Sequence, residues 1–378
     1  GYRFVVGQKE IVLTSIRIYM KSLLKYSMSV VAVSASILAF SSCDDWTDPE
    51  SLGLNNPSFE EQNPQLYADY IQDLKNYKAG EHKVIFVSFD NSLNEPAKQA
   101  ERLTAVPDSV DFICLNLPDN LNPVIQSEME KIREKGTRTL YSIDYGSFET
   151  DWKAMVKENP ALTEEEALEY LGERTDAMLS LCDKYGYDGI LIDYTGRSLV
   201  SMKPGALAEY NVRQQNFFNK VVEWQAGHTN KTLALFGNIQ YFVPENMSML
   251  NKFNYIILKT ASSTNADDLS LKAYLAIQAG EDIKNELYEG VNPVPTDRFI
   301  ACVQFPQAGD DDKVIGYWNT VDEKGEKTLA APGTAQWMGQ FSPDYTRKGI
   351  FIMSVQNDYY NDTYKQLREV IYIMNPNK

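Results

Sequence analysis

The residues with the clearest potential for chemistry lie in one short segment, 187–197, which reads YDGILIDYTGR. Its centre, Ile190–Ile192, is a continuous apolar run, as in strands that are covered on both faces. Asp193 and Tyr194 follow at the carboxyl end of this strand, where parallel α/β proteins build their sites. A carboxylate and an aromatic ring in this position can bind a sugar, and the carboxylate can also take part in acid–base chemistry.

A second carboxylate is expected at the same end of the fold. Asp144 follows another strand-like run, 139–143, so it should face the same region as Asp193. The two could in principle form an acid/base pair, but ligand binding or loop capping by Asp144 is favoured over catalysis. For Asp193, a ligand contact and a structural hydrogen bond remain alternatives. Asp188, at the start of its strand, is expected to be structural.

Polar and aromatic side chains also follow the other strand-like runs, among them Lys259 after the sixth run. Amides and carboxylates each make two or more directional hydrogen bonds, which suits sugar hydroxyls, and aromatic side chains can cover sugar rings. Each residue taken singly could equally belong to a loop or to the core, and Trp337 could equally anchor a helix. The further candidates for ligand binding are Tyr145, Asn116, Asn238, Gln240, Tyr241, Gln304, Gln356 and Trp337.

The elements that would position these residues alternate regularly along the chain. Helical stretches are expected at about 64–78, 123–135, 163–185, 204–228, 267–288 and 362–374, with starts at Asn122 and Thr163 for two of them. Eight strand–helix units in about 300 residues predict one (β/α)8, or TIM, barrel of parallel strands. A doubly wound open sheet is the alternative, but no GxGxxG or Walker lysine motif supports it. The eight apolar runs are 84–89, 112–117, 139–143, 189–193, 232–236, 255–258, 299–304 and 350–355.

Segment 187–197 resembles the signature strand of glycoside hydrolase family 18, the chitinases and endo-β-N-acetylglucosaminidases, which is written DGxDxDxE. Asp188, Gly189 and Asp193 match this pattern. Leu191 stands in place of its first inner Asp, and Thr195 stands in place of the catalytic Glu. Segment 136–143, GTRTLYSI, is similar to the third strand of the family, which commonly reads GxKVLLSI before a pair of glycines. The resemblance implies a family 18-like barrel over residues 80–378.

The resemblance also implies a chemistry that this chain lacks. In family 18 the substrate's own 2-acetamido group is the nucleophile, the motif's Glu is the proton donor, and the preceding Asp orients the acetamido group. Asp193 could still contact an acetamido nitrogen. Thr195 cannot supply the proton, because a hydroxyl is far too weak an acid, and general acid catalysis contributes about 10²–10⁴ in rate. No catalytic residue is therefore assigned, and the site is predicted to be degenerate.

The composition limits the partners and cofactors. A formal net charge of −16 argues against nucleic acid and against electrostatic docking on anionic lipid. The four cysteines have no CxxC spacing and there are only two histidines, so neither a zinc site nor an iron–sulfur cluster is expected. We expect no metal and no cofactor.

Residues 1–42 are predicted to be upstream sequence followed by a lipoprotein signal peptide. The first methionine is at position 20, and two lysines precede an apolar run at 28–40. Small residues then lead to Cys43. This resembles a bacterial lipoprotein signal, in which Cys43 becomes the lipidated first residue, and the acidic pair at 44–45 resembles the surface-export tag of Bacteroidetes lipoproteins. An ordinary buried cysteine in a helix is the alternative. Residues 43–79 would be the tether and an N-terminal helix.

Together these features predict an outer-membrane lipoprotein that faces the cell exterior. Its barrel would bind an oligosaccharide or glycoprotein glycan containing N-acetylglucosamine, of the N-glycan type, beside an outer-membrane importer and without hydrolysis. One alternative is an active endo-β-N-acetylglucosaminidase-like hydrolase with an altered acid/base arrangement. Another is a structural subunit whose barrel mouth is blocked.

Overall fold

The computed structural model describes residues 58–376, apart from positions 94, 288–289 and 291. The predicted signal peptide, the lipidation site Cys43 and the tether as far as residue 57 lie outside these residues. Within the described range, none of the helices has the length and hydrophobicity needed to traverse a lipid bilayer.

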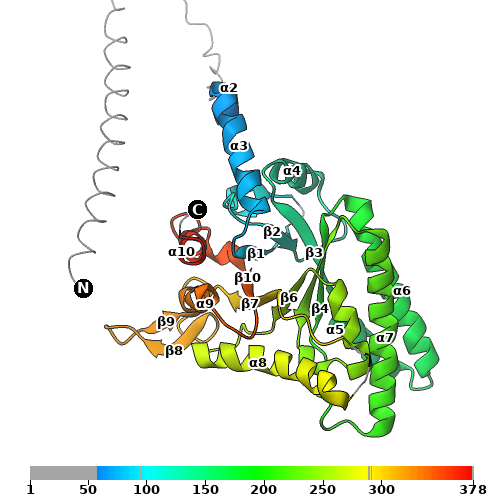
Figure 1. Ribbon diagram of the computed structural model, residues 1–378. Helices are drawn as coiled ribbons and strands as arrows, with labels where there is room; N and C mark the ends of the chain where they lie inside the picture. The colour runs from blue at the N-terminus through cyan, green and yellow to red at the C-terminus, as the bar shows by residue number, and fades with distance from the viewer. Residues whose placement is uncertain (1–57, 94, 288–289, 291, 377–378) are drawn as a thin grey trace, which may run out of the picture. The chain divides into compact units, whose positions relative to one another are not determined.

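Eight parallel strands close into a barrel in the order β1-β10-β7-β6-β5-β4-β3-β2 (Figure 1). All eight coincide with the predicted apolar runs to within a few residues, and the predicted (β/α)8 fold is confirmed. Most positions in these strands are buried, because helices or loops cover the outside and neighbouring side chains fill the inside. The strands are β1 (Val84–Phe89), β2 (Phe112–Leu115), β3 (Arg138–Asp144), β4 (Gly189–Tyr194), β5 (Thr232–Gly237), β6 (Tyr255–Leu258), β7 (Phe299–Gln304) and β10 (Arg347–Met353).

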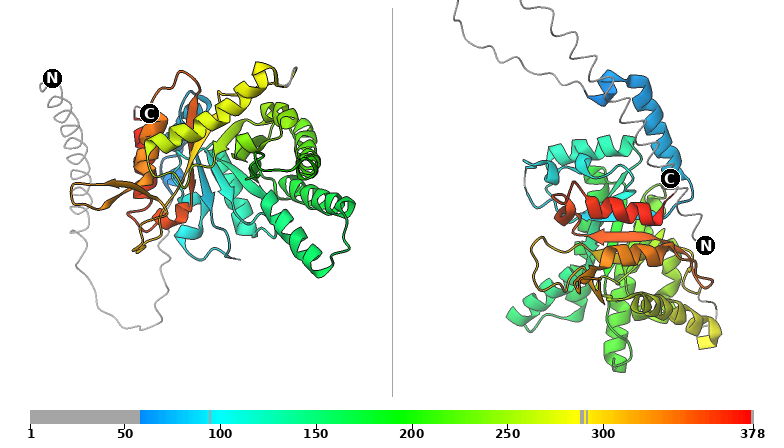
Figure 2. Two further views of the ribbon diagram at one scale, coloured as in Figure 1. Left: turned by 90° about the horizontal axis from the view of Figure 1, so that it is seen from below. Right: turned by 90° about the vertical axis from the view of Figure 1, so that its left-hand side faces the viewer.

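Helices surround the barrel in both views of Figure 2. Three of them, α2, α5 and α9, were not predicted. The antiparallel hairpin of β8 (Tyr317–Val321) and β9 (Lys327–Leu329), which projects from the barrel in Figure 1, was not predicted either. Short 3₁₀ segments rather than α-helices join β1 to β2 and β5 to β6. The helices are α2 (Phe59–Gln62), α3 (Pro64–Ala79), α4 (Pro123–Glu134), α5 (Tyr145–Glu158), α6 (Glu164–Tyr185), α7 (Pro204–Gly227), α8 (Ala266–Asp282), α9 (Ala330–Gly339) and α10 (Lys365–Met374).

Local capping signals start and stop the helices that precede β3 and β4. The Asn122 side chain accepts a hydrogen bond from the amide of Val124 and begins α4, as predicted. Thr163 and Glu166 form a reciprocal capping box at the start of α6. Gly186 ends α6 with a φ of 70°, a left-handed conformation that glycine adopts without strain. These signals fix the point at which the chain enters β4.

The barrel interior is a packed apolar core. Phe86 and Phe112 stack with their ring centroids 4.3 Å apart, and Tyr255 meets both rings edge-on. Leu191, one of the two degenerate motif positions, is 1% exposed and belongs to this inner cluster. The inner cluster and a larger cluster outside the strands together hold β4 from both sides.

The first two residues of the motif, Asp188 and Gly189, position β4. One carboxylate oxygen of Asp188 accepts from the Thr139 amide at 2.9 Å, and the other accepts from Arg133 Nε at 2.7 Å. A Cβ on Gly189 would lie 2.1 Å from the carbonyl oxygen of Thr232, so no larger residue fits without moving β5. Both residues therefore act on the strand and not on a ligand.

Replacing Asp188 with Ala should lower the free energy of unfolding by about 1–3 kcal/mol, because the buried Thr139 amide loses its acceptor. Urea denaturation checks this. Asp151→Ala, at an exposed position of α5, is the matched control and should change stability by less than about 0.5 kcal/mol. Equal stability of the two variants would contradict the structural role of Asp188.

Candidate functional site

The carboxyl ends of the eight strands form one end of the barrel, here called the mouth. Side chains alternate between the two faces of a strand, and Leu191 and Phe236 point inward. Asp193, two residues beyond Leu191, therefore points inward at the mouth. Asp144 of β3 lies directly opposite Asp193 in the strand register, so the two carboxylates are neighbours on the inner face.

An ion pair occupies the inner face of the mouth. Lys259, just beyond the end of β6, donates from Nζ to Asp193 Oδ1 at 2.5 Å. The same ammonium group lies 3.6 Å from the centroid of the Phe236 ring, a cation–π contact that adds to its stabilisation. The Asp193 side chain is 25% exposed and that of Lys259 is 21% exposed. The pair is thus half-buried, but open enough for a ligand to reach it.

The electrostatics of Asp193 follow from this setting. Burial raises the pKa of the Asp193 carboxyl, Lys259 opposes that rise through its charge and its hydrogen bond, and the nearby charge of Asp144 adds to it. The net result is a pKa of Asp193 above its ordinary value. Lys259 therefore limits a rise in the pKa of Asp193 that burial alone would make larger.

Asp144 caps a helix. Its Oδ1 accepts from the Ser147 amide at 3.3 Å at the N-terminus of α5, and its side chain is exposed. A carboxylate in this position also interacts favourably with the positive end of the helix dipole. The structure thus brings Asp144 and Asp193 together, as expected, but gives Asp144 a structural partner of its own.

The position of the family's catalytic glutamate holds no acid. Thr195 is exposed just beyond β4, and its backbone carbonyl accepts from the side chain of Asn238 at 3.0 Å. Leu191 is buried below it, so neither degenerate motif position carries a titratable group.

One carboxylate near Thr195 was missed by the sequence reasoning. Glu149, on the second turn of α5, lines a small cavity of about 90 Å³ together with Thr195, Tyr145 and Arg197. The Tyr145 hydroxyl is buried there, with no hydrogen-bond partner among the described residues. Glu149 gave no signal in the sequence, because the strand-end pattern does not extend into a helix that was itself not predicted.

Two of the proposed aromatic contacts lie away from the mouth. Tyr194 is 2% exposed, packs among the aromatic rings under α7, and bonds through its hydroxyl to Gln214 at 3.1 Å. It follows the inward-facing Asp193, so it points outward into the helix layer. Trp337 is 4% exposed and donates to Ser270 Oγ at 3.0 Å, with the Arg347 guanidinium 3.8 Å from its ring centroid. Trp337 anchors α9, which was the alternative expected for it.

The remaining candidates follow strand ends and are mostly half-buried. Gln304 ends β7 and makes a long contact of 3.4 Å to Ser354. Gln356 is partly buried, and its Oε1 has no hydrogen-bond partner among the residues described. Asn116 is exposed, and Gln240 and Tyr241 lie half-buried in the turn after β5. The amides among them can each donate and accept hydrogen bonds.

Over residues 58–376, with their gaps, no group of three His, Cys, Asp or Glu residues is arranged to hold a metal ion. The mouth itself presents a carboxylate–ammonium pair, several amides and the Thr195 hydroxyl.

Comparisons with known proteins agree with the barrel geometry. A family described as "Glycoside hydrolase family 18, BT1044-like" matches residues 47–373. A selenomethionine BT1044 variant with one glutamate replaced by glutamine superposes with a TM-score of 0.56 and 18% identity, over 84% of this chain and 95% of that one. At this identity the likeness shows the fold alone. No curated protein matches the chain significantly.

Two further solved structures are more distant. A chitinase from Bacteroides thetaiotaomicron has a TM-score of 0.43 and 15% identity, over 78% of this chain and 97% of its own. A mutant of the Group II chitinase catalytic domain 2 of Ostrinia furnacalis, in complex with penta-N-acetylchitooctaose, has a TM-score of 0.45 and 10% identity, over 78% of this chain and 96% of its own.

Lys259→Met should lower the free energy of unfolding by about 1–3 kcal/mol at pH 7, because the Asp193 carboxylate stays half-buried without its cation. This loss of stability relative to the wild type should become smaller as the pH falls. The pKa of Asp193 in the folded variant lies above its unfolded value, so protonation favours the fold, and the neutral acid needs no cation.

Urea denaturation of wild type and variant at pH 7 and pH 4.5 measures both effects. Lys153→Met, at an exposed position of α5, provides the control for loss of one lysine and should show no pH-dependent deficit. A Lys259→Met deficit that stays constant or grows towards acid pH would contradict the role assigned to the ion pair.

Proposed function

The chain belongs to glycoside hydrolase family 18, in its BT1044-like group, and from this premise we propose that the barrel mouth binds a glycan without hydrolysing it. Membership of the family and the closed eight-stranded barrel support glycan binding or hydrolysis as the coarser function. The choice between the two depends on the chemistry of the mouth.

The Asp193–Lys259 ion pair is the observation that carries the proposal. Hydrolysis of a glycosidic bond needs a group that gives a proton to the leaving oxygen. The Lys259 ammonium group, 2.5 Å from the Asp193 carboxylate, opposes protonation of Asp193, and Thr195 is no acid. A lysine ammonium this close to a carboxylate is a hydrogen-bond donor and not an efficient general acid near neutral pH. The side chains can therefore recognise a sugar but lack a proton for its departure.

The mouth offers both hydrogen-bond donors and hydrogen-bond acceptors to a neutral ligand. Asp193 can accept from an acetamido N–H, as the family resemblance implies, and Lys259 can donate to a hydroxyl or carbonyl oxygen. Gln304, Asn238 and Gln356, which follow strand ends, add amide groups at this end of the barrel. Because the charges at the centre cancel, we propose a neutral amino sugar, an N-acetylglucosamine-containing glycan of the N-glycan type.

The N-terminal segment extends the proposal to a cellular role. If Cys43 is lipidated, the barrel would be tethered to the outer membrane by residues 43–79, the predicted tether and N-terminal helix, with its mouth available to glycans outside the cell. Such a protein would capture glycans beside an outer-membrane importer. The signal-like sequence supports this part of the proposal, and determination of the mature N-terminus by mass spectrometry would test it.

A second function, hydrolysis with a relocated acid, is favoured by one observation. Glu149 lines the same cavity as Thr195, so a carboxyl group is available near the position that the family's glutamate would occupy. In this alternative Glu149 would protonate the leaving oxygen, and the lost acid of the motif would be replaced from α5.

Asp193→Ala should weaken glycan binding by about tenfold or more, because it removes a charged acceptor and leaves Lys259 without its partner. Isothermal titration with chitooligosaccharides and with a released N-glycan measures the affinity. Asp151→Ala should bind as the wild type does. Absence of binding to every amino-sugar glycan by the folded wild type would overturn the proposed function.

Wild-type protein should release no product from a chitooligosaccharide or a high-mannose glycoprotein at enzymatic rates, as measured by chromatography of the glycans. Product formation that disappears in Glu149→Gln would instead establish the hydrolase with a relocated acid. Ser147→Ala, two residues earlier on the exposed N-terminus of α5, is the control for a disturbance of that helix.

A further inference from the structure

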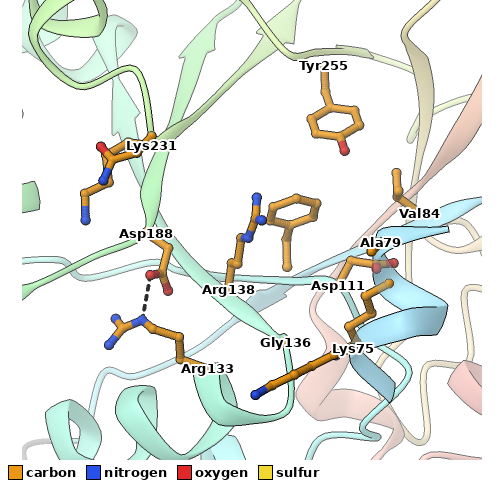
Figure 3. Close-up of a pocket in the computed structure, with 13 residues that line it drawn as sticks. Lys75, Ala79, Val84, Asp111, Arg133, Gly136, Arg138, Asp188, Lys231 and Tyr255 are labelled. Atoms are coloured by element: carbon orange, nitrogen blue, oxygen red, sulfur yellow. Dashed lines mark hydrogen bonds and ion pairs between the residues drawn. The ribbon is translucent and has the colours of Figure 1, made fainter. Parts of the chain in front are cut away.

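A second, larger cavity lies at the opposite end of the barrel. It has a volume of about 470 Å³ and opens between the amino ends of the strands, α3 and α4 (Figure 3). Val84, Phe112, Arg138 and Tyr255 are the first residues of β1, β2, β3 and β6, and all four line it. In TIM barrels this end serves stability rather than the reaction site, so the composition of its cavity needs its own explanation.

The lining is strongly basic, although the whole chain carries a net charge of −16. Two acidic residues, Asp111 and Asp188, face five basic ones. Figure 3 shows Arg138 extending into the space between the two aspartates. The five basic residues are Lys75 and Lys78 of α3, Arg133 of α4, Arg138 of β3, and Lys231 just before β5.

Both aspartates are fully used by structural partners. Asp111 accepts from the Ile85 amide at 2.8 Å with one oxygen and contacts the His82 ring at 2.8 Å with the other. Asp188 is shared between the Thr139 amide and Arg133. The carboxylates of the cavity therefore neutralise only Arg133 among its five cations.

The other four cations form no ion pair with any described residue. Lys78 donates to the Thr137 hydroxyl at 2.6 Å, and Lys231 donates to the Tyr187 carbonyl at 2.8 Å. Arg138 makes a single long contact of 3.4 Å to the Thr232 hydroxyl. Lys75, from the exposed face of α3, extends along the rim in Figure 3. An excess of positive charge is thus held around a space that could contain a small molecule.

Lys78 shows the cost of burying one of these cations. Burial lowers the pKa of Lys78 to about 8, against the attraction of Asp111 and Asp108, and the charge of Lys135 lowers it further. An anion in the cavity would remove this penalty. The opposite wall is formed by Tyr255 and Phe112, whose rings lie 5.5 Å apart and offer an apolar surface.

We propose that this cavity binds a small oxyanion, a phosphate or carboxylate group, carried on a sugar-sized ring. The planar guanidinium of Arg138 can bind two oxygens of such a group, and Lys75, Lys78 and Lys231 surround it. The ring would pack against Tyr255 and Phe112. This site is separate from the mouth and does not depend on glycan binding there, because the packed core of the barrel lies between them.

Titration calorimetry of the full chain at low ionic strength tests the proposal, with inorganic phosphate, glucose 6-phosphate and glucuronate as probes. We expect at least one probe to bind with a Kd of about 1 mM or lower. Tighter binding of glucose 6-phosphate than of glucuronate would show that the cavity takes a phosphate group. Tighter binding of glucuronate would show that it takes a carboxylate group. Tighter binding of glucose 6-phosphate than of inorganic phosphate would show that the sugar ring contributes to binding, as expected if it packs against Tyr255 and Phe112.

Arg138→Gln and Lys75→Gln should each weaken binding, Arg138→Gln by about tenfold or more. Both side chains are exposed, so neither change should unfold the barrel, and thermal melting checks this. Lys131→Gln, on the outer face of α4, removes one positive charge outside the cavity and should bind as the wild type does. Absence of binding by all three probes, or equal loss in Lys131→Gln, would overturn the proposal.

Discussion

The contact between Asp193 and Lys259 determines what the barrel mouth can do. A carboxylate that is half-buried at a strand end must be paired with a cation, bonded to donors, or protonated. A hydrolase of this family would use such a group beside a second acid. Here a lysine from the neighbourhood of β6 holds the charge in place, and the Phe236 ring supports the lysine. The mouth is thereby neutral and fixed, which suits recognition of a ligand more than proton transfer.

The strands could be predicted because their environment leaves a simple pattern. Buried parallel strands have apolar side chains on both faces, so each appears as a short apolar run, as Ile190–Ile192 does. Helix α5 was missed for a physical reason. Asp144 ends β3 and caps α5 at the same time, so no loop of turn-forming residues separates the two elements. The hairpin at 317–329 was missed because its exposed strands bury little apolar surface.

The site was predictable only in part, because sequence shows which residues end strands but not which ones meet across the barrel. Lys259 was noted only as polar, and its pairing joins residues 66 positions apart. Tyr194 is different, since strand alternation already implied that it points away from Asp193. Its placement among core aromatics could have been deduced. Trp337 offered no such signal, because its orientation depends on the helix α9 and on Arg347.

Net charge alone does not describe what a ligand would meet, because each end of the barrel has its own local balance. At the mouth, Asp193 and Lys259 cancel, and Asp144 is offset by a helix N-terminus. At the amino end, the aspartates are bound to backbone amides and to single partners, which leaves basic side chains unneutralised. A ligand experiences the groups within about 10 Å and not the sum over 378 residues, since salt screens the rest. This local balance is the reason why we propose a neutral sugar as the ligand at one end of an acidic protein and an anion at the other.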